Sequence, residues 1–551
     1  MTRGIPLLPL AVFVANATVA MAQSTVIPMR PDVSGWEVAV TSDHPLASEA
    51  GAAVLRKGGN AIDAAVTMAA VLSVVRPHMN GPGGDGFMLY RDGRTGKVYA
   101  LNGSGAAGAK ATPTFFAERG LKTIPGSGIL SVSVPGAVRM WEDALTRFGT
   151  IRLAAALAPA IGYATRGFPV SNRLSSDIGE SSRLLERDSV LARIYLPGGE
   201  APKPGTILRQ PELGRTLQRI ATGGARAFYR GPIAAQIAAY MESEGGLLTA
   251  ADLAGHRSQW QDPIETTYRG QRVLAFPPNT QGVTLLQQLN LAELFDLGQM
   301  GHNSVSYVHT LVEGSKIAYA DRDALVADPR FAQVPVADLI GKRRATENRS
   351  RIGDRATQIV VDTTRDGNGD TIYLGVVDRQ GNAVSWIQSN FAAFGSGKGV
   401  PGLGLILHNR GSLYSLDPKH PNIVAPGKRP YHTLSPAMVL NGDGSLAAVL
   451  GTPGGDGQTQ TILQILNNVV VFGMSAQQAV EAPRWRSYGR RVGIEPGVGT
   501  VVRDSLTARG HTVTIQQPGA EFGGAQMIRI LPSGARQVGS DFRREAYGIA
   551  W

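Results

Sequence analysis

The chain has 551 residues, of which 43% are hydrophobic and 18% charged, and this balance excludes a disordered chain and allows a large buried core. Its formal net charge of +11 would suit a nucleic-acid partner, but the lysines and arginines form no dense basic run, so we expect no nucleic acid. Because there is no cysteine and the nine histidines are scattered, we predict no disulfide, no thiolate chemistry, no metal and no cofactor.

The N-terminus has the pattern of a secretory signal. Residues 5–22 are apolar and end in Ala20-Met21-Ala22, which is typical of a small-x-small cleavage site. We therefore predict a signal peptide at residues 1–22 and an exported protein, periplasmic or extracellular, with no membrane contact once the signal is removed. An uncleaved anchor is the alternative, but Asn16, Thr18 and two prolines suit a spanning helix poorly.

Up to residue 340 the periodicity is mainly helical. Short strands are predicted at residues 38–40, 87–90, 98–101 and 272–276, and helices at 48–57, 61–75, 137–148, 153–165, 213–221, 233–243, 282–295 and 305–323. The run Gly81–Gly86 fits the dinucleotide pattern G-x-G-x-x-G, but it follows a helix and precedes a strand. We therefore expect a tight loop that brings backbone close to a neighbouring element.

The character of the sequence changes near residue 371. Residues 341–370 are charged and poor in apolar side chains, which predicts an exposed linker. Beyond them, strands are predicted at residues 373–377, 383–388, 437–440, 446–450, 512–516 and 525–531, with helices at 459–472 and 475–482. Strands at both ends of the chain and helices between them indicate an α+β fold with antiparallel sheets.

Thr371 lies where a polar run meets a β-branched segment. If the chain is cut before it, the hydroxyl and the new α-amine share one residue, and the amine, with an unperturbed pKa of roughly 7.7–8.0, can activate the hydroxyl as general base. While the peptide bond is intact, that nitrogen is an amide and cannot do so. From this stretch alone, an ordinary first residue of a strand remains the alternative.

Several motifs in order resemble the γ-glutamyltransferase (glutathione hydrolase) family. The segment Thr371–Gly397 resembles its active-site segment, and further matching runs are His44–Ser48, Gly58–Ala65, Val134-Pro135-Gly136, Ala318–Arg322, Pro426–Pro430, Ser435-Pro436 and Gly451–Gly455. The resemblance implies the N-terminal-nucleophile fold, a four-layer αββα sandwich with two antiparallel sheets between helical layers. It also implies a proenzyme that cuts itself into a large subunit, residues 23–370 with a helical lobe and the charged linker, and a small subunit, residues 371–551, which stay associated.

The same resemblance assigns the catalytic residues. Thr371 is the nucleophile that forms an acyl-enzyme from a small-molecule amide, and water or an amine then takes the acyl group. Ser389 stands where the family has a second threonine that bonds the nucleophile, and Gly454 and Gly455 stand where backbone N–H groups form an oxyanion hole. Glycines suit that task because the backbone must approach the substrate closely.

The substrate pocket departs from the family pattern. Ser104 replaces an arginine that holds the α-carboxylate of the donor, and Leu413 replaces the acid that holds its α-amine. We also assign Asn390 to this pocket, beside Phe391, which replaces an asparagine that contacts the donor. Finally, His432 and Thr433 replace a pair of serines.

Arg410 stands where a glutamate or glutamine is usual. Because Leu413 cannot pair an ammonium and an arginine can clamp a carboxylate, Arg410 predicts a donor with a terminal carboxylate. The alternatives for Arg410 are a surface or a structural role, whereas Asp85 or Asp456 could hold an amine instead and restore glutamyl recognition.

Three functions stay open at this point. The first is γ-glutamyl hydrolysis or transfer, and the second is acylase activity on dicarboxylic-acid monoamides, as in the relatives resembling glutaryl-cephalosporin acylase or oxamate amidohydrolase. The third is a secreted binding protein that has lost catalysis. No G-x-S-x-G, H-E-x-x-H or P-loop motif supports another enzyme class.

Overall fold

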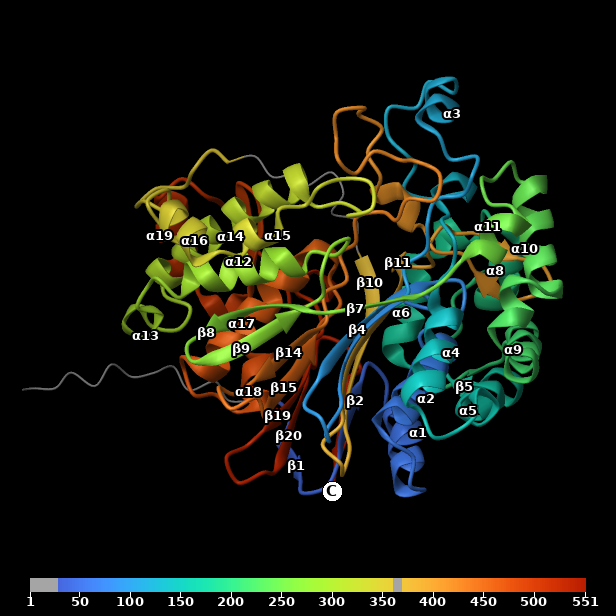
Figure 1. Ribbon diagram of the computed structural model, residues 1–551, viewed down its shortest axis with the longest axis horizontal. Coiled ribbons are helices and arrows are strands. Elements are labelled where there is room, and N and C mark those ends of the chain that lie inside the picture. Colours follow the sequence, from blue (N-terminus) through green and yellow to red (C-terminus); the bar gives the residue numbers. More distant parts are fainter. Residues whose placement is uncertain (1–27, 360–368) are drawn as a thin grey trace, which may run out of the picture.

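The computed structural model describes residues 28–359 and 369–551, so the predicted signal peptide lies outside the described residues. Two seven-stranded sheets face each other, and helices cover the outer face of each (Figure 1). Every strand pair within these two sheets is antiparallel. The predicted αββα sandwich is therefore confirmed. Among the described residues, no helix has the length and apolar character needed to cross a membrane.

One sheet, here called sheet I, contains the strand that carries Thr371. Its strands, in spatial order, are β21 (Tyr547–Ala550), β2 (Ala39–Ser42), β10 (Gly369–Val377), β11 (Ala383–Ala392), β3 (Asp85–Arg91), β4 (Val98–Asn102) and β7 (Gln259–Gln261).

The facing sheet, sheet II, is built in the same mixed way from early and late segments of the chain. Its strands, in spatial order, are β1 (Val33–Gly35), β20 (Arg536–Ser540), β19 (Gln526–Ile530), β15 (Leu446–Gly451), β14 (Ala437–Leu440), β9 (Gln271–Ala275) and β8 (Ile264–Tyr268).

Each helical layer packs on one sheet (Figure 1). The layer on sheet I and its lobe contain α1 (Pro45–Arg56), α2 (Ala61–Val75), α4 (Ala137–Phe148), α5 (Leu153–Arg166), α6 (Asn172–Glu180), α7 (Ser182–Leu185), α8 (Ser189–Tyr195), α9 (Pro211–Tyr229), α10 (Pro232–Ser243) and α11 (Ala250–Gly255). The layer on sheet II contains α12 (Gly282–Ala292), α13 (Leu297–Met300), α14 (Val305–Leu325), α15 (Val336–Leu339), α16 (Lys342–Arg349), α17 (Gln458–Val470), α18 (Ala476–Glu481) and α19 (Thr500–Ala508).

Several smaller elements lie outside these layers. They are α3 (Pro113–Ala117), the pairs β5 (Phe168–Pro169) with β6 (Ile207–Leu208) and β12 (Gly399–Val400) with β13 (Leu405–Ile406), and the three-stranded sheet of β16 (Trp485–Tyr488), β17 (Arg491–Ile494) and β18 (Thr512–Ile515).

The buried position of β10 follows from its sequence. All nine of its residues are buried, because one face packs on the helices of sheet I and the other on sheet II. Ile372 and Leu374 belong to the helix-side core, whereas Tyr373 and Val377 belong to the core between the sheets. A strand covered on both faces holds its residues in fixed positions, which suits a reactive side chain at its start.

The helix predictions at residues 61–75 and 137–148 match α2 and α4 residue for residue. Residues 341–359 of the predicted linker are mostly exposed, as expected, but this segment is not an irregular connection. Residues 342–349 form α16, with Ala345 buried, and Ile352 and Ile359 pack beside Leu291 and Ile317. The few apolar residues of this segment are therefore enough to dock it on the helical layer, while residues 360–368 lie outside the described residues.

Candidate active site

Thr371 lies at an irregularity between β10 and β11. Asp370 pairs with Phe391 and Ile372 pairs with Gln388, so Thr371 alone faces two residues of β11. Such a two-against-one bulge re-aims a side chain, and bulges are frequent beside active sites. Here the bulge turns the Thr371 hydroxyl toward Ser389.

A chain of hydroxyl groups connects Thr371 to the peptide bond before it. Thr371 Oγ1 donates to Ser389 Oγ at 3.0 Å, and Ser389 Oγ donates to the carbonyl oxygen of Asp370 at 2.7 Å. The N–H of Phe391 donates to the same Ser389 oxygen at 2.7 Å and fixes its position. All of these groups are buried. The predicted nucleophile and its predicted partner thus meet on the bond that the sequence analysis expects to be cut.

Gly454 and Gly455 lie in a turn against β10. The backbone φ angles of 124° and 56° fall in the region that L side chains rarely adopt, which explains two successive glycines. The turn Gly455–Gly457 contacts β10, and Gln281 Nε2 donates to the carbonyl oxygen of Gly455 at 3.2 Å. Their role as oxyanion-hole donors stays a prediction.

The Gly81–Gly86 run is a tight loop, as expected. A Cβ added to Gly84 would lie 2.5 Å from the carbonyl oxygen of Ser389, so only glycine allows the loop backbone to approach β11 this closely. The loop supports the strand beside the hydroxyl chain and leads directly into β3.

Arg410 is fully buried, so the surface alternative for it is wrong. Its guanidinium lies 3.4 Å from Asp85 Oδ1, donates to Thr433 Oγ1 at 3.2 Å and stacks over the ring of Phe391 at 4.5 Å. His432 Nε2 approaches the other oxygen of Asp85 at 2.6 Å. Four of the residues that differ from the family pattern therefore form one cluster around the Asp85 carboxylate.

The charges of this cluster compensate one another. Burial alone would raise the pKa of Asp85, but His432 and Arg410 beside it hold that pKa below its ordinary value. Burial, reinforced by the Arg410 charge, lowers the pKa of His432 to about 4, so the imidazole is neutral near pH 7, and in the tautomer that carries the proton on Nε2 it donates a hydrogen bond to the carboxylate. Asp85 is thus already paired and does not offer a free acid to a substrate amine.

The carboxylate of Asp456 is also paired with other side chains of the protein. It lies 3.0 Å from Arg322 Nη1 and accepts a hydrogen bond from the Tyr431 hydroxyl at 2.9 Å. Leu413 packs with Val326, Phe391 and Tyr431 in a small apolar cluster. The position that carries an acid in the family pattern is therefore apolar here.

Two other predicted substrate residues bond to the protein. Ser104 Oγ donates to Asn102 Oδ1 at 2.6 Å, and Asn390 Nδ2 donates to the carbonyl oxygen of Pro77 at 3.3 Å. Both side chains are buried. Whether either contacts a substrate stays a prediction, and the Asn390 amide lies toward the Gly81 loop.

Sequence reasoning missed Arg544 and Asp43. Arg544 Nη2 lies 2.8 Å from Asp370 Oδ1, although 174 positions separate them. Asp43 accepts from the Tyr373 N–H at 2.8 Å, and its burial raises its pKa to about 6. The one available signal was the acidic residue directly before Thr371, which required a buried cation nearby.

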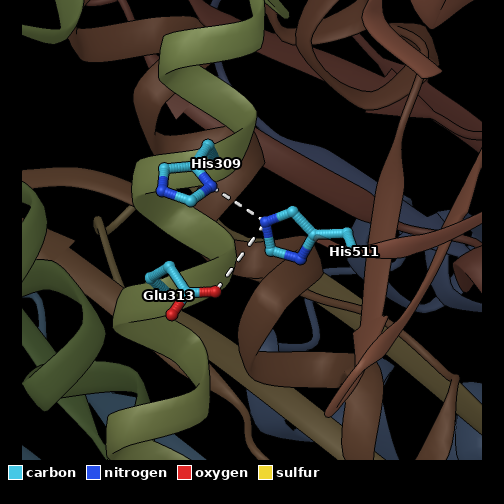
Figure 2. Close-up of side chains that lie close together, drawn as sticks. All are labelled: His309, Glu313 and His511. Carbon is cyan, nitrogen blue, oxygen red and sulfur yellow. Dashed lines mark hydrogen bonds and ion pairs between the residues drawn. The ribbon is translucent and has the colours of Figure 1, made fainter. Parts of the chain in front are cut away.

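A further buried cluster contains possible metal ligands that the scattered histidine positions did not suggest (Figure 2). His309 and Glu313 lie one turn apart on α14, and His511 Nε2 lies 2.8 Å from His309 Nδ1. The Lys316 ammonium already pairs with Glu313 at 2.6 Å, and His309 Nε2 bonds the Gly353 carbonyl at 2.8 Å. Among the described residues this hydrogen-bond network connects α14 to the segment near Gly353. The negative charge of Glu313 is balanced by Lys316.

The fold is that of the N-terminal-nucleophile hydrolases. The family model described as gamma-glutamyltranspeptidase matches residues 47–551, and the chain belongs to this family. It is 39% identical to the glutathione hydrolase-like YwrD proenzyme of Bacillus subtilis (strain 168), over 95% of this chain and 100% of that one. It is 38% identical to the acylase ACY 1 proenzyme of Pseudomonas sp. (strain SE83), over 94% of each. The crystal structure of a cephalosporin acylase from Bacillus halodurans superimposes with a TM-score of 0.90 at 36% identity, over 96% of this chain and 98% of that one.

Proposed function

We propose that this chain is a proenzyme that cuts itself between Asp370 and Thr371 and then hydrolyses amides through an acyl-enzyme on Thr371. The observation that carries the proposal is the hydroxyl chain from Thr371 through Ser389 to the Asp370 carbonyl. It supplies a nucleophile and a proton donor to the same carbonyl group before any free amine exists.

Self-cleavage begins when Thr371 Oγ1 attacks the carbonyl carbon of Asp370. The Thr371 proton passes to Ser389, and the Ser389 proton passes to the carbonyl oxygen, so no separate base is needed. When the C–N bond breaks, the Thr371 nitrogen takes a proton and becomes a free amine, and the acyl group remains as an ester on Oγ1. Water then hydrolyses the ester, which leaves a carboxylate on Asp370 and a hydroxyl on Thr371.

In the mature enzyme the new amine acts as base. It takes the Thr371 hydroxyl proton as Oγ1 attacks a substrate amide and gives that proton to the leaving amine. The N–H groups of Gly454 and Gly455 stabilise the negative charge that develops on the substrate oxygen. Water completes the cycle in hydrolysis, and an amine would complete it in transfer.

The two subunits remain associated after the cut because both sheets mix strands from either side of it. In sheet I, β10 from the small subunit lies between β2 from the large subunit and β11. Separating the subunits would break these pairs and expose the core between the sheets.

The pocket favours an acyl donor without an α-amine. Asp85 and Asp456 are paired with arginines, and Leu413 lies in an apolar cluster, so none of the three offers a free carboxylate to an ammonium group. We therefore favour an acylase of dicarboxylic-acid monoamides over a γ-glutamyl hydrolase. A comparison of glutaryl and γ-glutamyl anilides tests this choice, since equal or faster γ-glutamyl turnover would contradict it.

Intact mass and a denaturing gel test self-cleavage. We expect wild type to give two chains and Thr371→Ala to give one uncut, inactive chain with unchanged secondary structure. A folded wild-type protein that stays uncut and inactive would favour the third candidate, a binding protein. The matched control Thr41→Ala changes another buried threonine of sheet I, whose hydroxyl bonds Ser540, and should leave the cut intact.

A further inference from the structure

Arg544 is an arginine whose partner belongs to the bond that is cut. Its side chain is fully buried, and its ion pair with Asp370 is 2.8 Å long. The side-chain carboxylate of Asp370 is linked through Cβ and Cα to the carbonyl carbon that Thr371 attacks. Arg544 therefore lies within one short side chain of the reacting carbon.

The guanidinium has spare hydrogen-bonding capacity. Nε and Nη1 are buried and have no hydrogen-bond partner among the described residues. Although burial alone would lower the pKa of Arg544, the carboxylate of Asp370, with Asp177 and Asp43 further away, raises it above its ordinary value. A charged fork with unused donors is a site for a carboxylate, which it can bind through two parallel bonds.

The chemistry of Asp370 indicates which carboxylate fits. Its carbonyl carbon, Cα, Cβ and carboxylate follow one another with the connectivity of a succinyl group. In self-cleavage this acyl group forms an ester with Thr371 Oγ1, the same bond that a substrate acyl group would form. The uncut chain thus presents Thr371 with an internal succinyl-type amide whose carboxylate is bound by Arg544.

We propose that Arg544 binds the distal carboxylate of the acyl donor, that Asp370 occupies this site in the uncut chain, and that a dicarboxylic-acid monoamide of succinyl length takes it over after the cut. Arg410, which the sequence suggested for this task, already has Asp85 and Thr433 as partners. The inference rests on the proposed self-cleavage, because only the cut can release Asp370 from Arg544.

The first experiment uses self-cleaved wild type, Arg544→Lys and Arg529→Lys with succinyl and butyryl 4-nitroanilides. The two acyl groups have the same length, but only succinyl carries the charge. We expect wild type to prefer succinyl by about 10- to 100-fold in kcat/KM, the range that a charge-assisted hydrogen bond supports. In Arg544→Lys most of this preference should disappear through a higher KM for the succinyl anilide, and butyryl turnover of the same variant serves as its reference. The control, Arg529→Lys, changes a half-buried arginine of sheet II and should behave as wild type.

A second measurement does not depend on that variant being cut. Succinate should inhibit wild type competitively, at about tenfold lower concentration than butyrate. Asp370→Asn should slow self-cleavage, because Arg544 loses its counter-charge, yet its small subunit is identical to wild type and should keep the succinyl preference.

Three results would overturn the inference: equal inhibition by succinate and butyrate, no succinyl preference in wild type, or wild-type selectivity in Arg544→Lys. A loss of succinyl preference in Arg410→Lys alone would return the carboxylate site to Arg410. If wild type is not cut at all, the proposed function fails first, and the gel distinguishes that failure from these.

Discussion

Two buried arginines, Arg410 and Arg544, have different kinds of partner. Arg410 pairs with Asp85 on β3, which no step of the mechanism removes. Arg544 pairs with Asp370, the residue on the far side of the bond to be cut. A buried charged side chain can bind a ligand only if its partner can leave. Of these two ion pairs, only that of Arg544 with Asp370 meets this condition.

The largest effect should come from breaking the permanent pair. Asp85→Asn keeps the shape of the side chain but leaves the Arg410 charge buried without a counter-ion, which should cost about 3–5 kcal/mol of unfolding free energy. Urea denaturation in a Thr371→Ala background measures it without interference from the cut. The matched variant Asp370→Asn should cost less, because the Asp370 side chain is 11% exposed whereas that of Asp85 is fully buried, and Asp177 and Asp43 remain as counter-charges of Arg544. Similar losses in the two variants would erase the distinction between the pairs.

The next effect concerns the carbonyl beside the releasable pair. Ser389→Ala removes the proton donor to the Asp370 carbonyl and should slow self-cleavage by about 100- to 1000-fold, as expected for the loss of one oxyanion donor. Ser389→Thr restores a hydroxyl and should recover much of the rate. A time course of the two bands on a denaturing gel gives both rates. Normal cutting in Ser389→Ala would remove Ser389 from the mechanism.

Acid should destabilise the protein through His432, which lies beside Arg410. The folded-state pKa of His432 is lowered to about 4 from an ordinary value near 6.5, so between these values the unfolded chain binds more protons. Its contribution is constant above about pH 6.5 and stability is lost as the pH falls toward 4, by about 3 kcal/mol. His256, whose pKa burial lowers to about 3, acts in the same direction. His432→Gln should flatten the curve of melting temperature against pH, and an unchanged curve would contradict this account.

The smallest effect concerns Asn390. Asn390→Ala removes the bond to the Pro77 carbonyl, and its loss should cost about 1 kcal/mol of unfolding free energy with little change in self-cleavage. Thermal unfolding and the gel assay measure the two quantities. A large loss of amide turnover with normal stability would instead restore Asn390 as a substrate residue.

The sequence was most informative where local pattern decides the structure. The apolar run of α2 and the switch to β-branched residues at Ile372 predicted their elements, and the motifs around Thr371 predicted the fold family. The edge strands β1 and β21 and the inner strand β20 were missed because they are short and partly polar, and pairing across the chain, not propensity, makes them strands.

The candidate site shows the same limit. Ser389 could be assigned because its place in a motif fixes its distance from Thr371, whereas Arg544 lies far along the chain in a polar run without periodicity. The sequence also identified Arg410 as unusual but not its partner. Which charge faces which carboxylate depends on tertiary packing, and no local pattern encodes it.

The N-terminal residue of the smaller chain, determined by sequencing and intact mass, tests the central claim most directly. The account predicts that this chain begins at Thr371 and that Thr371→Ala yields only the uncut chain. Amide hydrolysis by a folded wild-type protein that remains in one piece, or a small chain that begins at another residue, would contradict it.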